Sequence, residues 1–186
     1  STPDLLRILP EAAWLPNLVP LDHPLYLPRQ TASQPPLHLC HSPTRKDLKN
    51  TKELLVVADT LAGQVSLDLI DNVPHAQCLQ RKQQSHAVFD HMQGYYGVSS
   101  LEGMSQGKAV IAGVDDFNET RIKEFFGCTS IPWIRARDEE ELEQRLLELA
   151  QDPGLCEQKG RDSRTFMKRY WTEERVLESL LALYEQ

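Results

Sequence analysis

Two stretches of the sequence carry residues that could hold a negatively charged ligand. The first, Gly94–Gly113, contains five of the nine glycines. A glycine at position 97 would let the backbone approach a ligand, and the N–H groups that begin a helix near Val98 and Ser99 could bind a phosphate with help from the helix dipole. Glu102 follows one turn later and could accept hydrogen bonds from two neighbouring ribose hydroxyls or close a capping box with Ser99. The residues alone leave both interpretations open.

The second stretch is a cluster of four cations, namely Arg45, Lys46, Lys49 and Lys52. Arg45 and Lys49 follow a predicted buried strand, and they would lie one helical turn apart if a helix begins there. An Arg and a Lys in this place can neutralise a diphosphate leaving group, on which negative charge develops as a glycosidic bond breaks. The alternative is a solvated basic helix start, because runs of charge usually lie on the surface.

Four further residues are candidates to line the same cleft. His41 stands at the exit of the predicted strand, and Gly94, Tyr95 and Tyr96 precede the glycine at position 97. The tyrosines could pack on a sugar or a base, although aromatic residues in a loop over a sheet more often only cover it. The sequence has no G-x-G-x-x-G fingerprint and no complete P-loop, and its histidines and cysteines lack the spacing of a metal site. We therefore expect no metal and no cofactor.

The alternation of buried runs and amphipathic stretches predicts an α/β fold with a doubly wound parallel sheet. Strands are expected near residues 37–40, 65–70, 85–89, 109–112 and 131–134. Helices are expected near 3–9, 48–62, 75–83, 99–106, 116–126 and 138–150, and two more begin at Pro153 and after Thr172. Capping patterns place helix starts at Ser99 and Asp116. The helices after residue 137 would cover the sheet. The glycine-rich stretch then follows a strand at its carboxyl end, where open α/β sheets bind ligands.

Length and composition fit one globular domain preceded by a connector. The chain has 186 residues, of which 40% are hydrophobic and 25% charged. Residues 1–36 hold eight of the twelve prolines and no glycine, so they are predicted to form an extended, proline-rich interdomain connector. Residues 37–186 are predicted to form the Rossmann-like ligand-binding domain.

Charge and cysteine content exclude several classes of function. A net charge of −7 argues against general affinity for nucleic acid or for an acidic membrane, because polyanions are bound by a basic field. The four cysteines are scattered without a Cys-x-x-Cys pair, which suits free thiols in a reducing cytoplasm. The sequence contains no signal peptide and no run of about 18 apolar residues, so a soluble protein is expected.

Two segments resemble the nucleotide-sugar-dependent glycosyltransferases of the two-domain GT-B type, in particular the family-4-like group. The segment His41-Ser-Pro-Thr-Arg45 followed by Leu48-Lys49-Asn-Thr51 is similar to that family's H-[AS]-P-[ST]-x-R…K-G-T pattern. The segment from Phe89 to Ile111 is similar to its D-Q…G-x-Y-G-x-x-x-x-E-A-M-x-x-G-K-P-V-I pattern. The Leu-Pro-Asn of residues 15–17 is similar to the L-P-N that follows the hinge in the family. The clear resemblance covers about residues 38–113.

The resemblance implies a C-terminal, donor-binding half of a glycosyltransferase that transfers a hexose from a nucleoside-diphosphate sugar to a glycan, lipid or protein acceptor. In the family, an Arg and a Lys contact the donor diphosphate and a glutamate contacts the ribose. These roles would fall to Arg45, Lys49 and Glu102. Many members carry Glu-x7-Glu, and this sequence has Gly94 at the first of those positions. An N-terminal acceptor-binding half is expected in the full protein, and this half alone is expected to turn over poorly.

Two other interpretations stay open from the sequence. The first is a non-catalytic module that keeps the GT-B half-fold for protein interaction, which Gly94 and the missing half would suit. The second is an unrelated flavodoxin-like or sugar-isomerase domain, which would bind a flavin or act without a nucleotide. A cytoplasmic location is expected, with peripheral contact to a membrane through the other half as an alternative.

Overall fold

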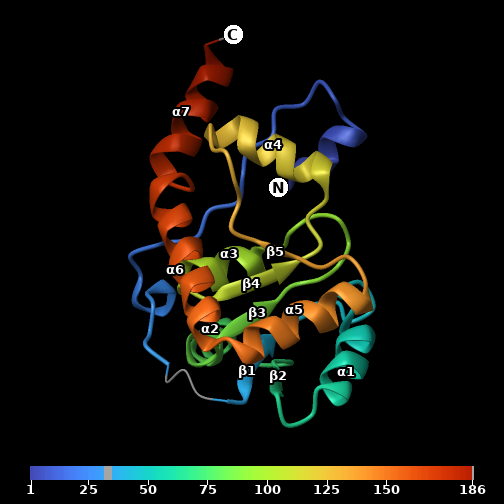
Figure 1. Cartoon of the computed structure of the whole chain (residues 1–186). Coiled ribbons are helices and arrows are strands. Elements are labelled where there is room, and N and C mark those ends of the chain that lie inside the picture. The colour runs from blue at the N-terminus through green and yellow to red at the C-terminus, as the bar shows by residue number, and fades with distance from the viewer. Residues whose placement is uncertain (32–34, 186) are drawn as a thin grey trace.

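The centre of the fold is a sheet of five strands in the order β2-β1-β3-β4-β5 (Figure 1). The computed structural model describes residues 1–31 and 35–185. All four strand pairs are parallel, and the strands are β1 (Leu37–His41), β2 (Val65–Leu69), β3 (Ala87–Phe89), β4 (Ala109–Ala112) and β5 (Ile134–Arg135). Such a sheet needs helices on both faces because both faces are apolar.

The described helices supply that cover from both sides. They are η1 (Pro3–Arg7), η2 (Pro24–Tyr26), α1 (Thr51–Thr60), α2 (His75–Gln84), α3 (Val98–Ser105), α4 (Asp116–Phe126), α5 (Glu139–Gln151), α6 (Pro153–Arg169) and α7 (Glu173–Tyr184). Side chains of α1 and α5 pack in one apolar cluster, and side chains of α2, α3 and α4 pack in another. Helix α7 extends away from the sheet, as Figure 1 shows.

Successive residues of the central strands point into opposite clusters, as the two-residue period of a strand requires. Val88 and Val110 lie in the cluster with α2 and α3, whereas Phe89 and Ile111 lie in the cluster with α1 and α5. All four side chains are fully buried. The predicted α/β fold with a parallel sheet and covering C-terminal helices is therefore confirmed.

The proline-rich segment is packed against the domain. Trp14, Val19 and Tyr26 are buried in the same cluster as α3 and α6. The side-chain amides of Gln83 and Gln106 donate hydrogen bonds to carbonyl oxygens of residues 24, 25 and 27. These contacts satisfy backbone acceptors that an extended segment cannot satisfy by itself.

Several predicted helix and strand ends are corrected by the structure. The helix expected from residue 48 begins at Thr51, because Asn50 takes a left-handed backbone conformation with φ of 52°. Helix α4 is capped by Asp115, whose carboxylate accepts from Asn118 N, rather than by Asp116. The strand expected at 131–134 is found at Ile134–Arg135. The differences at α1 and α4 arise from a turn residue and a capping residue that the apolar periodicity does not register.

The helix starts predicted after Asp152 and Thr172 are confirmed, since each side chain accepts a hydrogen bond from the backbone three residues on. All four cysteines are free thiols, and Cys78 is more exposed than the other three. Within residues 1–31 and 35–185, no helix has the length and apolar composition that crossing a membrane requires.

Candidate functional site

The loops that follow β1 and β3 meet at the carboxyl edge of the sheet. After β1 the chain crosses to β2 on one side, and after β2 it returns to β3 on the other side of β1. This reversal is a topological switch point: the loops after β1 and β3 start side by side and then run in opposite directions. Open sheets of this kind bind ligands in the crevice between two such loops. The candidate residues Lys49 and Gly97 come from these two loops.

Lys49, Asp90 and Gly97 form one contact group there. The Lys49 Nζ donates to Asp90 Oδ1 at 2.9 Å, and the Gly97 N–H donates to Asp90 Oδ2 at 2.5 Å. The Asp90 side chain is only 1% exposed, and the hydroxyl of Ser100 donates to it at 2.7 Å. Burial by itself raises the pKa of Asp90, but the charges of His91 and Lys49 and the hydrogen bonds that it accepts lower it to about 2. Asp90 is therefore a carboxylate at any physiological pH.

Gly97 is the N-cap of α3, and the contact group leaves no room for a side chain there. A Cβ at this position would lie 2.7 Å from Lys49 Nζ and 2.9 Å from Asp90 Oδ1. The Lys49 ammonium thus rests against the N-cap residue of α3, at the helix end where N–H groups point outward and the helix dipole is positive. An anion at this place would meet an ammonium and a helix N-terminus together.

Glu102 does not form the capping box with Ser99. The residue is 6% exposed. Both oxygens of its carboxylate accept hydrogen bonds, one from His75 Nε2 at 2.7 Å and one from Lys82 Nζ at 2.5 Å. The Ser99 hydroxyl accepts from Lys82 Nζ at 2.9 Å and lies 3.2 Å from the hydroxyl of Ser42. Burial lowers the pKa of Lys82, but the Glu102 carboxylate raises it above its ordinary value. Lys82 is therefore an ammonium, and its buried ion pair with Glu102 ties α2 to α3.

Arg45 lies apart from this group. It stands in a turn before α1, so the expected spacing of one helical turn from Lys49 does not occur. Its side chain is 65% exposed and pairs with Asp47 at 2.9 Å. Lys46 pairs with Asp71. Of the cation cluster in the sequence, Lys49 is the member that the fold brings to the start of α3.

The four candidates for the cleft wall have different positions. Gly94 has a φ of +87°, and a Cβ there would lie 3.0 Å from Asp115 Oδ2, so a larger residue would be strained. Tyr95 is half-buried with its ring centroid 4.5 Å from that of His91. Tyr96 is fully buried between Trp133 and Trp171 and therefore belongs to the core rather than to a cleft wall.

His41 is also buried rather than open to a cleft. Its Nδ1–H donates to the carbonyl oxygen of Phe89 at 3.1 Å, so its Nε2 accepts from the hydroxyl of Thr51 at 2.9 Å. Burial lowers the pKa of His41 to about 4, so the ring is neutral at pH 7. It joins β1 to β3 and α1, which holds the two loops of the site at a fixed separation.

Three residues of the site were not among the sequence candidates, namely His75, Lys82 and Asp90. Asp90 had a detectable signal, because it is a charged residue directly after a buried strand that precedes the glycine loop. Lys82 lies in a helix whose other residues are largely polar, so nothing in the sequence distinguishes it from a surface lysine. No group of three or more potential metal ligands gathers among residues 1–31 and 35–185.

Comparison with known proteins relates this fold to glycosyltransferases. No protein-family model and no curated protein matches the sequence. Among solved structures, a point mutant of TarM from S. aureus, in complex with fondaparinux, alpha-GlcNAc-glycerol and UDP, matches with a TM-score of 0.71 at 15% identity. That match covers 97% of this chain and 42% of TarM. Sucrose-phosphate synthase from Thermosynechococcus elongatus matches with a TM-score of 0.70 at 16% identity, over 100% of this chain and 57% of that protein.

A third match is to a domain whose structure was solved by itself. The C-terminal domain of the group 1 glycosyltransferase LpcC from Francisella tularensis matches with a TM-score of 0.59 at 14% identity, over 80% of this chain and 97% of that domain. This chain spans about half the length of the two larger proteins. Its five-stranded parallel sheet with C-terminal helices therefore matches in fold the Rossmann-like half of GT-B group 1 glycosyltransferases.

Proposed function

We propose that this chain is the donor-binding half of a glycosyltransferase that uses a nucleoside-diphosphate sugar. The observation that carries the proposal is the position of the Lys49 ammonium against Gly97 at the start of α3. A diphosphate placed there would receive N–H groups of α3 near Val98 and Ser99 and the charge of Lys49. The complex of TarM with UDP supports a nucleoside diphosphate as the ligand class.

In the proposed reaction the bond between the sugar and the donor diphosphate breaks. A new bond forms between the sugar and an acceptor hydroxyl, which loses its proton, and the nucleoside diphosphate leaves. Lys49 and the α3 N-terminus stabilise the negative charge that develops on the departing diphosphate. The other half of the protein would bind the glycan, lipid or protein acceptor, with residues 1–36 as the connector between the halves. The reaction would take place in the cytoplasm, with any membrane contact made by that other half.

Glu102 is the proposed ribose contact, and it implies a rearrangement. Both of its oxygens are bound in the described structure, so the ribose hydroxyls would share or displace the hydrogen bond from His75. His75 is the exposed partner, at 64% of its side chain, whereas Lys82 is 1% exposed. His75 is therefore the partner that a nucleotide could replace without disturbing the core.

Calorimetric titration with UDP, GDP and their free nucleosides tests the proposal, with and without EDTA. We expect each nucleoside diphosphate to bind more tightly than its free nucleoside. Its affinity should be the same with and without EDTA, because the proposed site holds the phosphates without a metal. Amide NMR shifts should move at Gly97 and Val98. A chain that binds no nucleoside diphosphate, or that binds one without perturbing these amides, contradicts the proposal.

A non-catalytic module is the second candidate, and Gly94 favours it. No side-chain carboxylate projects from that position, and Asp115, which lies against it, is paired with Arg7 at 2.6 Å. Under this alternative, the full-length protein would bind a nucleoside diphosphate weakly or not at all and would release no nucleotide from UDP- or GDP-sugars. Release of UDP or GDP that depends on an added acceptor would exclude it.

A further inference from the structure

A cavity lies at the opposite edge of the sheet from Lys49 and Gly97. Its volume is about 460 Å³, within the usual range for small-molecule sites. Leu37 is the first residue of β1, and His86 and Lys108 directly precede β3 and β4, so the cavity opens at the amino ends of the strands. The ends of α5 and the start of α6 complete its wall. The proposed donor site does not use this cavity.

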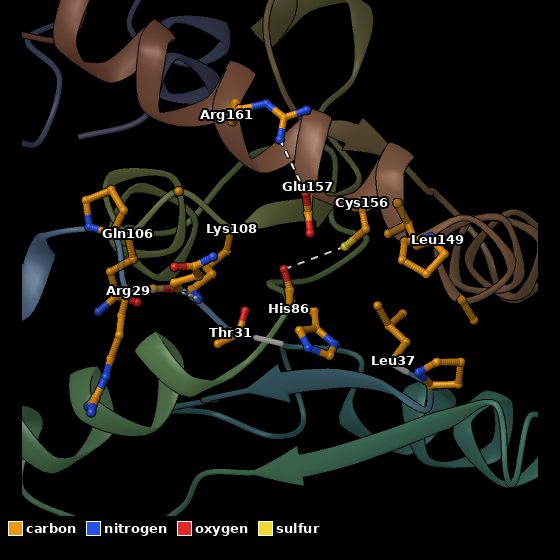
Figure 2. Close-up of a pocket in the computed structure, with 16 residues that line it drawn as sticks. Arg29, Thr31, Leu37, His86, Gln106, Lys108, Leu149, Cys156, Glu157 and Arg161 are labelled. Carbon is orange, nitrogen blue, oxygen red and sulfur yellow. Dashed lines mark hydrogen bonds and ion pairs between the residues drawn. The ribbon is translucent and has the colours of Figure 1, made fainter. Parts of the chain in front are cut away.

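The walls of this cavity differ in character (Figure 2). Gln106, Lys108 and Arg29 lie together on one side, and Leu37, Leu149 and Cys156 lie on the other. A ligand that satisfies both walls would carry a polar group at one end and an apolar body at the other. Such a ligand would also cover apolar surface, which stabilises binding.

Lys108 gives the polar side its charge. The residue is 3% exposed, and its Nζ donates to the carbonyl oxygens of Gln83 at 2.8 Å and Arg29 at 3.4 Å. An ammonium has three N–H donors, so these two acceptors leave one donor for another group. Among the described residues no carboxylate pairs with Lys108, and burial lowers its pKa to about 8. A buried ammonium without a counterion is costly, and an anion in the cavity would supply one.

The acidic residue of the cavity wall does not take that role. Glu157 pairs with Arg161, one turn further along α6, at 3.4 Å. The side-chain Nε2 of Gln106 donates to the carbonyl oxygens of Leu25 and Leu79, while its buried Oε1 accepts no hydrogen bond within the described part of the chain. Since the Gln106 oxygen can only accept, the polar side offers an anion the ammonium of Lys108, and the nearby Glu157 carboxylate is paired with Arg161.

We propose that this cavity binds a small organic anion with an apolar body, such as a short aliphatic or aromatic carboxylate. Its negative group pairs with Lys108, and its body lies against Leu37 and Leu149. The site is separate from the proposed donor site. The two sites lie at opposite ends of α3, since Val98 begins that helix and Gln106 follows its last residue.

Hexanoate and benzoate are suitable first ligands, with hexan-1-ol and hexylamine as matched controls of neutral and positive charge. We expect either carboxylate to shift the backbone amides of Gly107, Lys108 and Leu149 in NMR spectra and to leave that of Gly97 in place. The pKa of the Lys108 ammonium should rise when the carboxylate is bound, because the anion stabilises its charged form. The two controls should bind more weakly.

Three variants separate a real site from nonspecific binding. Lys108→Met should weaken carboxylate binding about tenfold or more through loss of a charge-assisted contact. Ala150→Phe keeps the charge of Lys108 and fills the apolar side of the cavity, so it should also weaken carboxylate binding. This second variant tests the proposal even if Lys108→Met folds poorly. Lys168→Met changes the same charge at an exposed position of α6 outside the cavity wall and should bind as the parent does. The proposal is overturned if neither carboxylate binds at millimolar concentration, if hexylamine binds as well as hexanoate, or if both cavity variants bind unchanged.

Discussion

Replacing Lys49 by methionine should remove diphosphate binding selectively. The ammonium rests against Gly97 and is 19% exposed, so an anion bound there would contact it in a partly desolvated setting. A hydrogen bond to a charged group contributes about 1.5–3 kcal/mol. Lys49→Met is therefore expected to weaken UDP or GDP binding by roughly 10- to 150-fold.

The assay compares each nucleoside diphosphate with its free nucleoside by calorimetry. Since the nucleoside carries no phosphate, Lys49→Met should leave its affinity unchanged. Lys52→Met is the matched control, because it removes the same charge from an exposed position on α1. Lys49→Met also leaves Asp90 buried without its ammonium partner. Circular dichroism must therefore first establish that Lys49→Met is folded at the temperature used. Equal losses for nucleoside and diphosphate, or no loss for either, would refute the assignment of Lys49 to the phosphates.

Three further predictions concern the groups around this site. Asp90→Asn should lower the free energy of unfolding at pH 7 by about 2 kcal/mol, because the folded pKa of about 2 lies below the ordinary 3.8. This contribution is present above about pH 4 and is lost as the pH falls towards 2, so urea unfolding of parent and variant should converge in acid, and parallel curves would contradict the prediction. His75→Ala should strengthen nucleoside binding by freeing one oxygen of Glu102, whereas Glu102→Gln should weaken nucleoside binding about tenfold. Calorimetry measures both affinities. If the two variants change the affinity for a 2′,3′-dideoxynucleoside equally, Glu102 does not contact the ribose hydroxyls. Tyr96→Ala should lower the free energy of unfolding by about 3–5 kcal/mol, because it truncates a large core side chain. Tyr95→Ala should lower it far less in the same urea assay. A comparable loss for both variants would show that the two rings are not divided between core and surface.

The secondary structure was largely readable from the sequence because it depends on local pattern. Apolar residues at alternate positions marked β1 and β2, a continuous apolar run marked β4, and the spacing of leucines marked α5. Caps such as Asp152 followed by Pro153 also depend only on neighbours in the chain. The predicted start of α1 was wrong because an unusual backbone conformation at Asn50 decides that boundary.

The candidate site was only partly readable, because its charges are paired by the fold. Lys49 and Asp90 are 41 residues apart, and Lys82 and Glu102 are 20 apart. A sequence pattern ranks Arg45 with Lys49 because both are cations near one strand end. The fold separates them, since the turn before α1 directs Arg45 to solvent and Lys49 to the start of α3.

The sequence by itself determined the class of fold and the place of the glycine loop, because hydrophobic period and turn residues act over a few neighbours. Only the tertiary structure decided that Tyr96 is core, that Glu102 is held by Lys82 and His75, and that Asp90 anchors the start of α3. These outcomes depend on which strands lie side by side and on which polar groups lose their water when the helices pack. Burial then forces each charge to find a partner, and the choice of partner is a property of the whole fold.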